Sequence, residues 1–163
     1  MKWAEVSPVY KNSDNLKKNN YRPVSVLTAI SKTYETVMNN QMVEHFDALF
    51  NDLLSAFRKL YGCQTLLLKF IEDLKAAMDK SHKIGAVFMD LSKAFDCLPH
   101  GLLIAKLHAY GLSTAACQLV LNYLKERKQR VKITNCRSTW KTLTKGVPQG
   151  SILGPLLFNV FYK

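Results

Sequence analysis

Two aspartates lie close together in the stretch AVFMDLSKAFDCLPH, residues 86–100. Asp90 stands where an apolar run ends, and Phe95 follows five residues later, directly before Asp96. A carboxylate at the C-terminal end of a buried strand can reach into a cleft, where oxygen ligands suit Mg²⁺ or Mn²⁺. A lone aspartate at such a position more often caps a turn, and Asp96 alone is better explained as a helix cap. Metal-dependent chemistry therefore needs support from other parts of the chain.

Two further segments contain residues that could bind a phosphorylated ligand. In GVPQGSILGP, residues 146–155, three glycines and two prolines form a loop whose backbone can approach another molecule closely, with Gln149 at its apex. In NYRPVSVL, residues 20–27, Arg22 precedes a proline and is held extended, so its guanidinium can present a fork to a phosphate. By itself, the first segment is also explained by a tight turn, and the second by a surface arginine.

Positive charge is concentrated in the C-terminal part of the chain. Of the 163 residues, 23 are Lys or Arg and 12 are Asp or Glu, a net charge of +11. Residues 101–163 contain ten of these basic side chains and one acidic side chain, which accounts for nine of the eleven excess charges. The densest part is LKERKQRVKITNCRSTWKTLTKG, residues 124–146. Such a patch indicates a polyanionic partner, most often nucleic acid, although a solvated basic hairpin has the same composition.

The hydrophobic pattern indicates the elements that position these residues. Apolar residues at helical spacing predict a helix over 31–50, with Ser31 as its cap, and a second helix after Gly62. A short apolar run predicts a buried strand over 84–91. The other expected elements are a loop or exposed hairpin over 7–25, helices over 101–110 (ending at Gly111) and from Ser113 to about Arg127, strands in QRVKIT and STWKTLT around a turn at Asn135–Cys136, and a loop over 146–155 that enters an apolar helix. This order predicts an α+β domain. The last helix, with nothing following to pack it, suggests a truncation.

The composition argues against several other classes of protein. The four cysteines, Cys63, Cys97, Cys117 and Cys136, form no C-x-x-C pair, and no histidine stands at ligand spacing from them. This argues against a zinc site and against a disulfide framework. The start of the chain has no secretory signal, and no apolar run is long enough to span a bilayer. We therefore expect an intracellular protein with reduced thiols, no disulfide partner and no membrane partner.

Taken together, these segments resemble the reverse transcriptase domain of non-LTR (LINE-type) retrotransposons. The resemblance covers about residues 19–161 and rests on four blocks: NNYRPVSVLTAISKTYE, SAFRKLYGCQTLLL, GAVFMDLSKAFDCLPHGLLIAKLHAYGL and KGVPQGSILGPLLFNVF. The combination of D-L-S-K-A-F-D with G-V-P-Q-G-S-I-L-G-P-L-L-F is highly specific. The resemblance implies a partial right-hand polymerase with helices packed on a small, mostly antiparallel sheet. It assigns about residues 1–80 to a fingers-like part and about 81–163 to an incomplete palm.

The resemblance also implies roles for single residues. Asp90 matches the first catalytic aspartate, which binds both metal ions, and the backbone carbonyl of Leu91 matches a further metal ligand. Phe95 matches the aromatic residue under the nucleotide sugar. Its ring would occupy the space that a ribose 2′-hydroxyl needs, which favours deoxynucleotides. The implied nucleotide-binding residues are Arg22, Phe95, Gln149 and Gly150.

The implied partners are an RNA template, a DNA primer and deoxynucleoside triphosphates. Mg²⁺ or Mn²⁺ is the implied cofactor of the complete domain. The basic segment lies between the two most specific blocks, and we expect it to contact the template–primer backbone. This expectation is our own and is not transferred from the family. The residues expected to make these contacts are Lys125, Arg127, Lys128, Arg130 and Lys132.

One motif of the family is absent from the sequence. An aromatic-Ala-Asp-Asp turn should follow the loop over 146–155, yet no Asp or Glu occurs after Glu126. We therefore expect a fragment of an RNA-directed DNA polymerase that is inactive as an isolated chain. The alternative is a non-catalytic nucleic-acid-binding fragment or relic. An RNA-dependent RNA polymerase is a weaker alternative, because Phe95 would leave too little room for the 2′-hydroxyl of a ribonucleotide.

Overall fold

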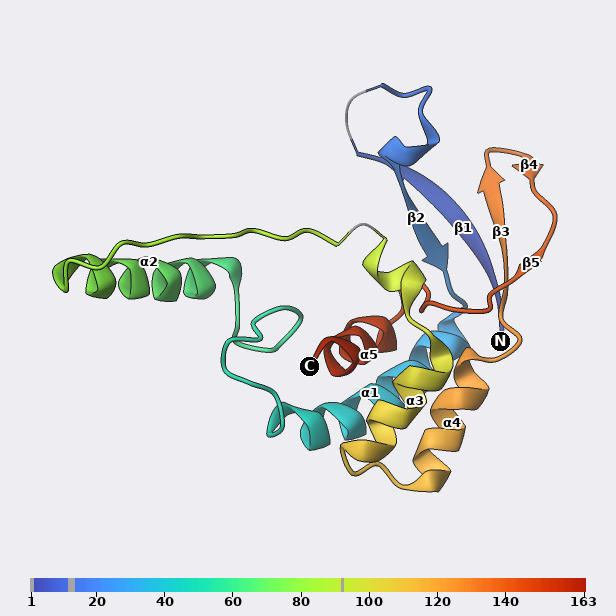
Figure 1. Cartoon of the computed structure of the whole chain (residues 1–163). Coiled ribbons are helices and arrows are strands. Elements are labelled where there is room, and N and C mark those ends of the chain that lie inside the picture. The colour runs from blue at the N-terminus through green and yellow to red at the C-terminus, as the bar shows by residue number, and fades with distance from the viewer. Residues whose placement is uncertain (1, 12–13, 92) are drawn as a thin grey trace.

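The strands of the protein form a small mixed sheet at one end of the molecule (Figure 1). The computed structural model describes residues 2–11, 14–91 and 93–163. The strands are β1 (Trp3–Tyr10), β2 (Tyr21–Val26), β3 (Lys128–Ile133), β4 (Cys136–Arg137) and β5 (Lys141–Thr142). Their order is β2-β1-β3-β4, with β5 also paired to β3.

The pairing of these strands joins the beginning of the chain to its C-terminal part. β1 and β2 form an antiparallel hairpin in which Val9 is opposite Arg22, and β1 runs parallel to β3 with Glu5 opposite Arg130. β3 pairs antiparallel with β4 and with β5. The expected hairpin over 7–25 and the expected α+β class are confirmed, and most of the pairings are antiparallel.

The helices agree closely with the hydrophobic pattern. They are α1 (Ala29–Asp47), α2 (Cys63–Asp79), α3 (His100–Ala109), α4 (Thr114–Leu124) and α5 (Leu153–Tyr162), with short 3₁₀ turns η1 (Lys18–Asn20) and η2 (Ala94–Cys97). Ser113 caps α4 as expected, by accepting a hydrogen bond from the Ala116 N–H. The expected cap of α1 is wrong: Thr28 is the N-cap residue, and its side chain accepts from the Ser31 N–H.

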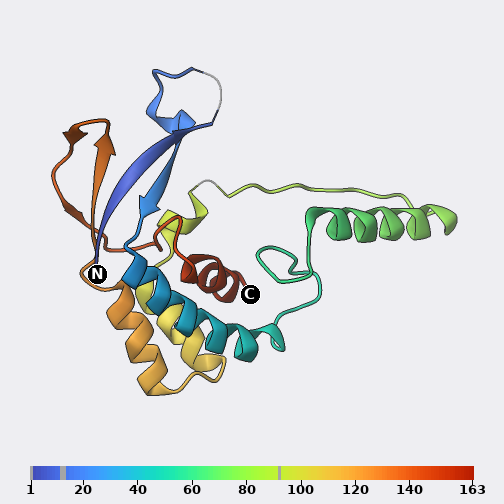
Figure 2. The ribbon, with the colours of Figure 1, turned by 180° about the vertical axis from the view of Figure 1, so that it is seen from behind.

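The hydrophobic core lies between the helices (Figures 1 and 2). Its fully buried side chains are Phe46 of α1, Leu98, Leu103, Leu107, Val120, Leu124, Leu153, Leu157 and Val160. In the last helix, α5, Leu153, Leu157 and Val160 are each 0% exposed, because α5 packs into the group formed by α1, α3 and α4. Helices α1, α3, α4 and α5 therefore share one hydrophobic core.

The expected buried strand over 84–91 is wrong. The segment is extended but pairs with no strand among the described residues, and Val87, Phe88 and Met89 are 86%, 83% and 84% exposed. The segment runs back beside α2 (Figure 1). The Phe88 ring lies edge-on to the Phe70 ring of α2, with their centres 6.1 Å apart. An apolar run shows that a segment can be buried, but a strand also needs a partner for its backbone hydrogen bonds.

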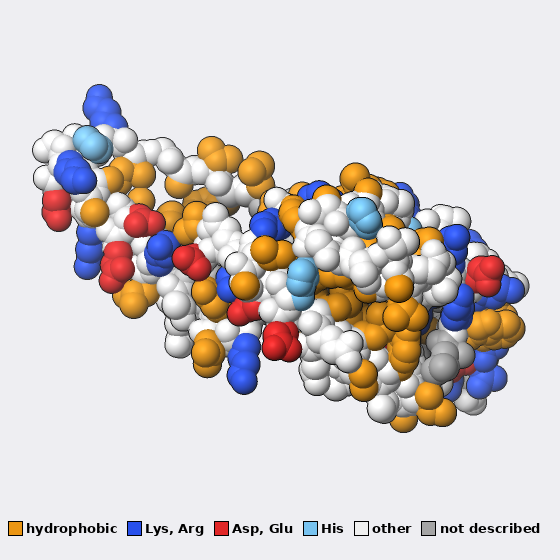
Figure 3. All heavy atoms as spheres, turned by 90° about the horizontal axis from the view of Figure 1, so that it is seen from below, with side chains coloured by type: hydrophobic (Ala, Val, Ile, Leu, Met, Phe, Trp, Pro, Cys, Tyr) orange, Lys and Arg blue, Asp and Glu red, His pale blue; other side chains and the backbone are white. Residues whose placement is uncertain are grey.

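Helix α2 and the segment after it project from the rest of the molecule. Figure 3 shows hydrophobic side chains reaching the surface both on this projecting part and on the helical body. None of the α2 side chains is buried, although its apolar stripe was read correctly as helical. The assignment of about residues 1–80 and 81–163 to fingers and palm stays a prediction. The β1–β3 pairing joins these two ranges in one sheet.

Candidate functional site

The turn that carries Phe95 is bound directly to the loop that carries Gln149. The Gly146 N–H donates to the Leu98 carbonyl at 2.7 Å, and the Val147 N–H donates to the Phe95 carbonyl at 2.9 Å. The His100 ring donates from Nε2 to the Gly146 carbonyl at 2.7 Å. These three hydrogen bonds hold two segments together that are about fifty residues apart in the sequence.

Gly146 permits this close contact. Its φ is +83°, and a Cβ atom there would lie 2.8 Å from the Asp96 Cα and from the carbonyl oxygens of Phe95 and Asp96. Such distances are far below van der Waals contact with backbone atoms that cannot move aside. A glycine is therefore required at this point for both steric and conformational reasons.

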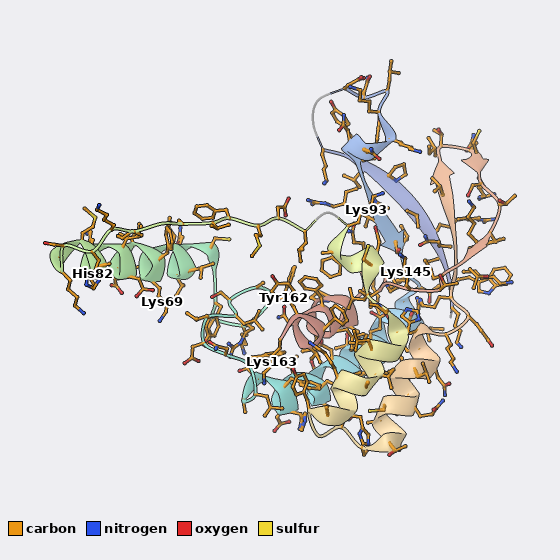
Figure 4. All side chains as sticks on the ribbon, viewed as in Figure 1. Lys69, His82, Lys93, Lys145, Tyr162 and Lys163 are labelled. Atoms are coloured by element: carbon orange, nitrogen blue, oxygen red, sulfur yellow. The ribbon has the colours of Figure 1, made fainter. Side chains whose placement is uncertain are left out.

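Phe95 is half-buried at this junction. Its ring stacks on the Phe158 ring of α5 at 5.0 Å and lies edge-on to the Phe57 ring at 5.9 Å. Burial raises the pKa of the carboxyl of the neighbouring Asp96, and the nearby Lys93 ammonium opposes that rise. Figure 4 shows Lys93 where the extended segment meets η2.

The tip of the second loop is held against β2. The Ser25 N–H donates to the Gln149 carbonyl at 2.7 Å. Gly150 has a φ of +97°, and a Cβ atom there would lie 3.0 Å from the Ser25 carbonyl oxygen and 3.3 Å from Val24 Cγ1. The side-chain oxygen of Gln149 is buried and accepts no hydrogen bond from the described residues. Gln149 is thus fixed through its backbone, and its side-chain oxygen can still accept a hydrogen bond.

A buried glutamate fixes the other end of this loop. Glu35 of α1 is 0% exposed, and its Oε2 accepts from the N–H groups of Ile152 at 2.7 Å and Leu153 at 3.4 Å. The Ser31 hydroxyl donates to Oε1 of the same carboxylate at 3.4 Å. The first N–H groups of a helix have no partner within it, and a carboxylate there also interacts favourably with the helix dipole. Glu35 therefore anchors the start of α5 to α1.

A small pocket lies beside the loop tip. It has a volume of about 130 Å³ and is lined by residues of β2, β3, η2 and the loop: Pro23, Ser25, Asp96, Gln129, Leu143, Lys145, Gly146, Val147, Pro148 and Gln149. Figure 4 shows Lys145 on the segment that leads into this loop. The lining combines carboxyl, amide and ammonium groups but is too small for a nucleotide.

Arg22 lies on the opposite face of β2 from this pocket. Side chains alternate between the two faces of a strand, and Pro23 and Ser25 take the pocket side. The register places Arg22 on the same face as Val9 and, further along β1, Glu5. Glu5 in turn is opposite Arg130 of β3. One face of the sheet therefore contains both the expected triphosphate-binding arginine and the basic strand; this face is the basic sheet face below.

The basic strand is arranged around one carboxylate. Arg130 donates two hydrogen bonds to Glu5, one of them from Nε at 3.0 Å. Lys132 and Arg137 lie 3.6 Å and 3.3 Å from the same carboxylate. The Arg130 hydrogen bond is the main cause of a lowered pKa of Glu5, with the charges of Lys132 and Arg137 adding to it. Three cations to one anion leave this face positively charged.

Arg127 does not fit the expected nucleic-acid contact. Its side chain is 2% exposed, its Nη1 donates to the Tyr123 carbonyl at 3.2 Å, and its guanidinium lies 4.7 Å from the centre of the Tyr123 ring. Burial raises the pKa of the Tyr123 hydroxyl, and the Arg127 charge opposes that rise. Arg127 follows α4, so it satisfies a free carbonyl at the end of that helix. By contrast, Lys125 is exposed.

Asp90 and Leu91 lie on the exposed extended segment. Among the described residues, no group of three or more His, Cys, Asp or Glu side chains could hold a metal ion. One carboxylate and one carbonyl are fewer ligands than a bound Mg²⁺ needs from protein and substrate together. The donors in the described residues therefore do not form a metal site.

The sequence matches a family model described as reverse transcriptase (RNA-dependent DNA polymerase) over residues 9–163. The chain belongs to the reverse transcriptase family. An RNA-directed DNA polymerase from mobile element jockey of Drosophila funebris is 32% identical over 148 residues, which is 90% of this chain. A probable RNA-directed DNA polymerase from transposon BS of Drosophila melanogaster is 33% identical over 144 residues, or 86% of the chain.

These relatives make the chain a reverse transcriptase domain of the non-LTR retrotransposon type. A type-1 retrotransposable element R2 polyprotein of Nasonia vitripennis also matches, at 26% identity over 141 residues and 85% of the chain. The reverse transcriptase chain spans only 16%, 16% and 13% of the lengths of these three relatives. Reverse transcriptases generally use divalent metal ions and act on nucleic acid templates and deoxynucleotides.

Two further findings describe this reverse transcriptase chain. None of the helices in the described part of the chain has the length and apolar content needed to cross a membrane. In the same part of the chain all four cysteines are free thiols, with Cys117 buried and the others exposed.

Sequence reasoning did not identify Glu35, Gly146 or the two tryptophans of the sheet region. Glu35 could have been found, because it lies seven residues before Met42 and eleven before Phe46, which places a carboxylate on the buried stripe of the helix. Gly146 belongs to the loop over 146–155, whose glycines indicate a close backbone approach but not the segment that is approached. The tryptophans gave no comparable signal, since their contacts come from distant parts of the chain.

Proposed function

We propose that this chain supplies the nucleotide-binding loop and a nucleic-acid-binding surface of an RNA-directed DNA polymerase. The observation that supports this most strongly is the basic sheet face, where the register brings Arg22 together with Lys128, Arg130 and Lys132. Gln149 of the loop is bonded to Ser25 of β2, the strand that also carries Arg22. In this proposal the face binds the phosphate backbone of template and primer.

Nucleotide selection is proposed for Phe95, Gln149 and Gly150. The hydrogen bonds between 95–98 and 146–147 give Phe95 a fixed position relative to the loop. A ring held in this way by Phe158 and Phe57 can exclude a ribose 2′-hydroxyl without moving aside. Arg22 would bind the triphosphate as a bidentate donor.

Asp90 is proposed as one carboxylate ligand of the divalent metal ions, with the Leu91 carbonyl beside it. Since no second carboxylate cluster lies among the described residues, we propose that the isolated chain binds nucleic acid but does not catalyse synthesis. The free thiols are consistent with the proposed intracellular location. The exposure of the segment around Asp90 favours the second candidate, a module that only binds nucleic acid.

Filter binding of a labelled RNA–DNA template–primer over a series of salt concentrations tests the proposal. Each phosphate-binding lysine that is removed should lower the salt slope by about 1. We expect this for Lys128→Ala and for Lys132→Ala. Lys69→Ala, on the projecting α2 (Figure 4), is the matched control and should leave the slope unchanged. Binding with no salt dependence, or equal effects of all three changes, would remove the basis for the proposed surface.

A further inference from the structure

Two tryptophans lie together at the edge of the basic sheet face. Trp3 of β1 and Trp140, just before β5, have ring centres 4.8 Å apart with their planes inclined by 56°. Trp3 remains 56% exposed despite this contact. An aromatic side chain of this size is usually buried or used for binding, so the exposed ring invites a functional explanation.

The same two rings are flanked by cations. The Lys128 ammonium lies 5.3 Å from the centre of the Trp3 ring, and the Arg130 guanidinium lies 4.4 Å from the centre of the Trp140 ring. The parallel register places Lys128 directly opposite Trp3. The Arg130 guanidinium is also fixed by Glu5, so the rings and charges form an ordered group. We name Trp3, Trp140, Lys128 and Arg130 the tryptophan platform.

We propose that the tryptophan platform binds single-stranded nucleic acid by stacking on its bases, a role that deepens, and rests on, the proposed function. Surfaces that bind single strands combine a positively charged path for the phosphates with aromatic rings for the bases. The platform has the exposed Trp3 ring. Its Arg130 and the adjacent Lys132 and Arg137 surround the single carboxylate of Glu5, so this surface carries an excess of positive charge. Bases in a duplex are already stacked on each other and cannot lie on the ring. The same surplus of charge disfavours an apolar protein partner.

Tryptophan fluorescence reports on this surface directly, because the chain contains two tryptophans and both belong to the platform. The chain is titrated with single-stranded RNA, single-stranded DNA and a duplex of the same length, with heparin as a polyanion that has no bases. We expect single strands to quench the fluorescence strongly, and the duplex and heparin to quench it much less. Whichever single strand quenches more identifies the preferred strand.

Substitution separates stacking from charge. Trp3→Leu should weaken single-strand binding about tenfold while leaving duplex binding nearly unchanged, since stacking of one base contributes on that scale. Trp3→Phe keeps an aromatic ring and should restore most of the affinity, which excludes a folding defect. Phe88→Leu, at another exposed aromatic residue that lies far from the sheet, is the matched control.

Two outcomes would overturn the inference, and they differ in what else they affect. Equal binding of single strands, duplex and heparin, unchanged by Trp3→Leu, would leave the basic sheet face as a charged surface only and the proposed function intact. The absence of any nucleic acid binding in the filter assay would remove the proposed function and the inference together.

Discussion

Replacing Glu35 with alanine should destabilise the protein strongly, because this carboxylate is buried and bonded to a helix end. The change removes the acceptor of the Ile152 and Leu153 N–H groups without giving them access to water. A buried donor that loses its partner costs about 1–3 kcal/mol. Loss of a negative charge at a helix N-terminus adds about 0.3–2 kcal/mol.

The expected loss is about 2–4 kcal/mol of unfolding free energy rather than the sum of the upper limits. The Leu153 hydrogen bond is long, at 3.4 Å, and removing a buried charge also removes its desolvation cost. For a chain of 163 residues, a loss of about 3 kcal/mol corresponds to a fall in Tm of about 6–12 °C.

Urea denaturation followed by circular dichroism measures this difference. Glu44→Ala, an exposed glutamate on the same helix, is the control and should change stability by less than about 0.5 kcal/mol. Glu35→Gln keeps an acceptor oxygen but loses the charge, so it should fall between the two and remain measurable if Glu35→Ala does not fold. If Glu35→Ala matched Glu44→Ala within error, Glu35 would not anchor the loop and α5 to α1.

Three further outcomes are expected from single substitutions. Gly146→Ala should lower the free energy of unfolding, measured by urea denaturation, by more than about 2 kcal/mol, because the added Cβ would lie 2.8 Å from backbone atoms in a positive-φ conformation. Gly101→Ala is the control: its Cβ would meet nothing within 4 Å, so the change should be neutral or slightly stabilising. The pKa of Glu5 is lowered from 4.5, so the wild type should be more stable than Glu5→Gln above about pH 4.5. This difference in unfolding free energy should disappear as the pH falls through the lowered pKa. A difference that grew in acid would contradict the pairing of Glu5 with Arg130. Phe88→Lys should delay aggregation, measured by light scattering, without lowering the melting temperature, since the Phe88 ring is 83% exposed. A fall in the melting temperature would instead show that the ring is packed.

Local sequence patterns predicted most of the fold correctly. Helix periodicity placed α1, α2, α3 and α4, because an apolar stripe at helical spacing is a property of consecutive residues. Ser113 was identified as a cap for the same reason, since its partner is three residues away. The polar, turn-rich composition over 7–25 indicated a loop or an exposed hairpin, and β1 and β2 form the hairpin.

Two expectations depended on what a segment or side chain contacts in the fold, which composition does not show. The run over 84–91 is apolar enough for a buried strand, but its own residues cannot specify which strand should pair with it. Arg127 lies in a basic segment, yet its guanidinium turns to the carbonyl of Tyr123 and is buried. A count of charges cannot distinguish such an arginine from Lys128, which lies on the sheet face.

The candidate site could be predicted as a set of residues but not as an arrangement. The motifs identified Phe95, Gln149 and Gly150, whereas their connection depends on Gly146 contacting the backbone at Phe95 and Asp96. The roles assigned to Asp90 and Arg22 stay predictions. The structure adds that Asp90 is exposed and that Arg22 shares a face with the basic strand.

Primer extension on an RNA template, with Mg²⁺ or Mn²⁺ and with binding measured in the same samples, tests the central claim most directly. That claim is that the chain contains the nucleic-acid-binding surface and one carboxylate of a reverse transcriptase but no complete metal site. We expect the isolated chain to bind the template–primer in a salt-dependent manner without extending the primer. Extension that Asp90→Asn abolishes would contradict the claim, because it would show that the chain assembles a working metal site by itself.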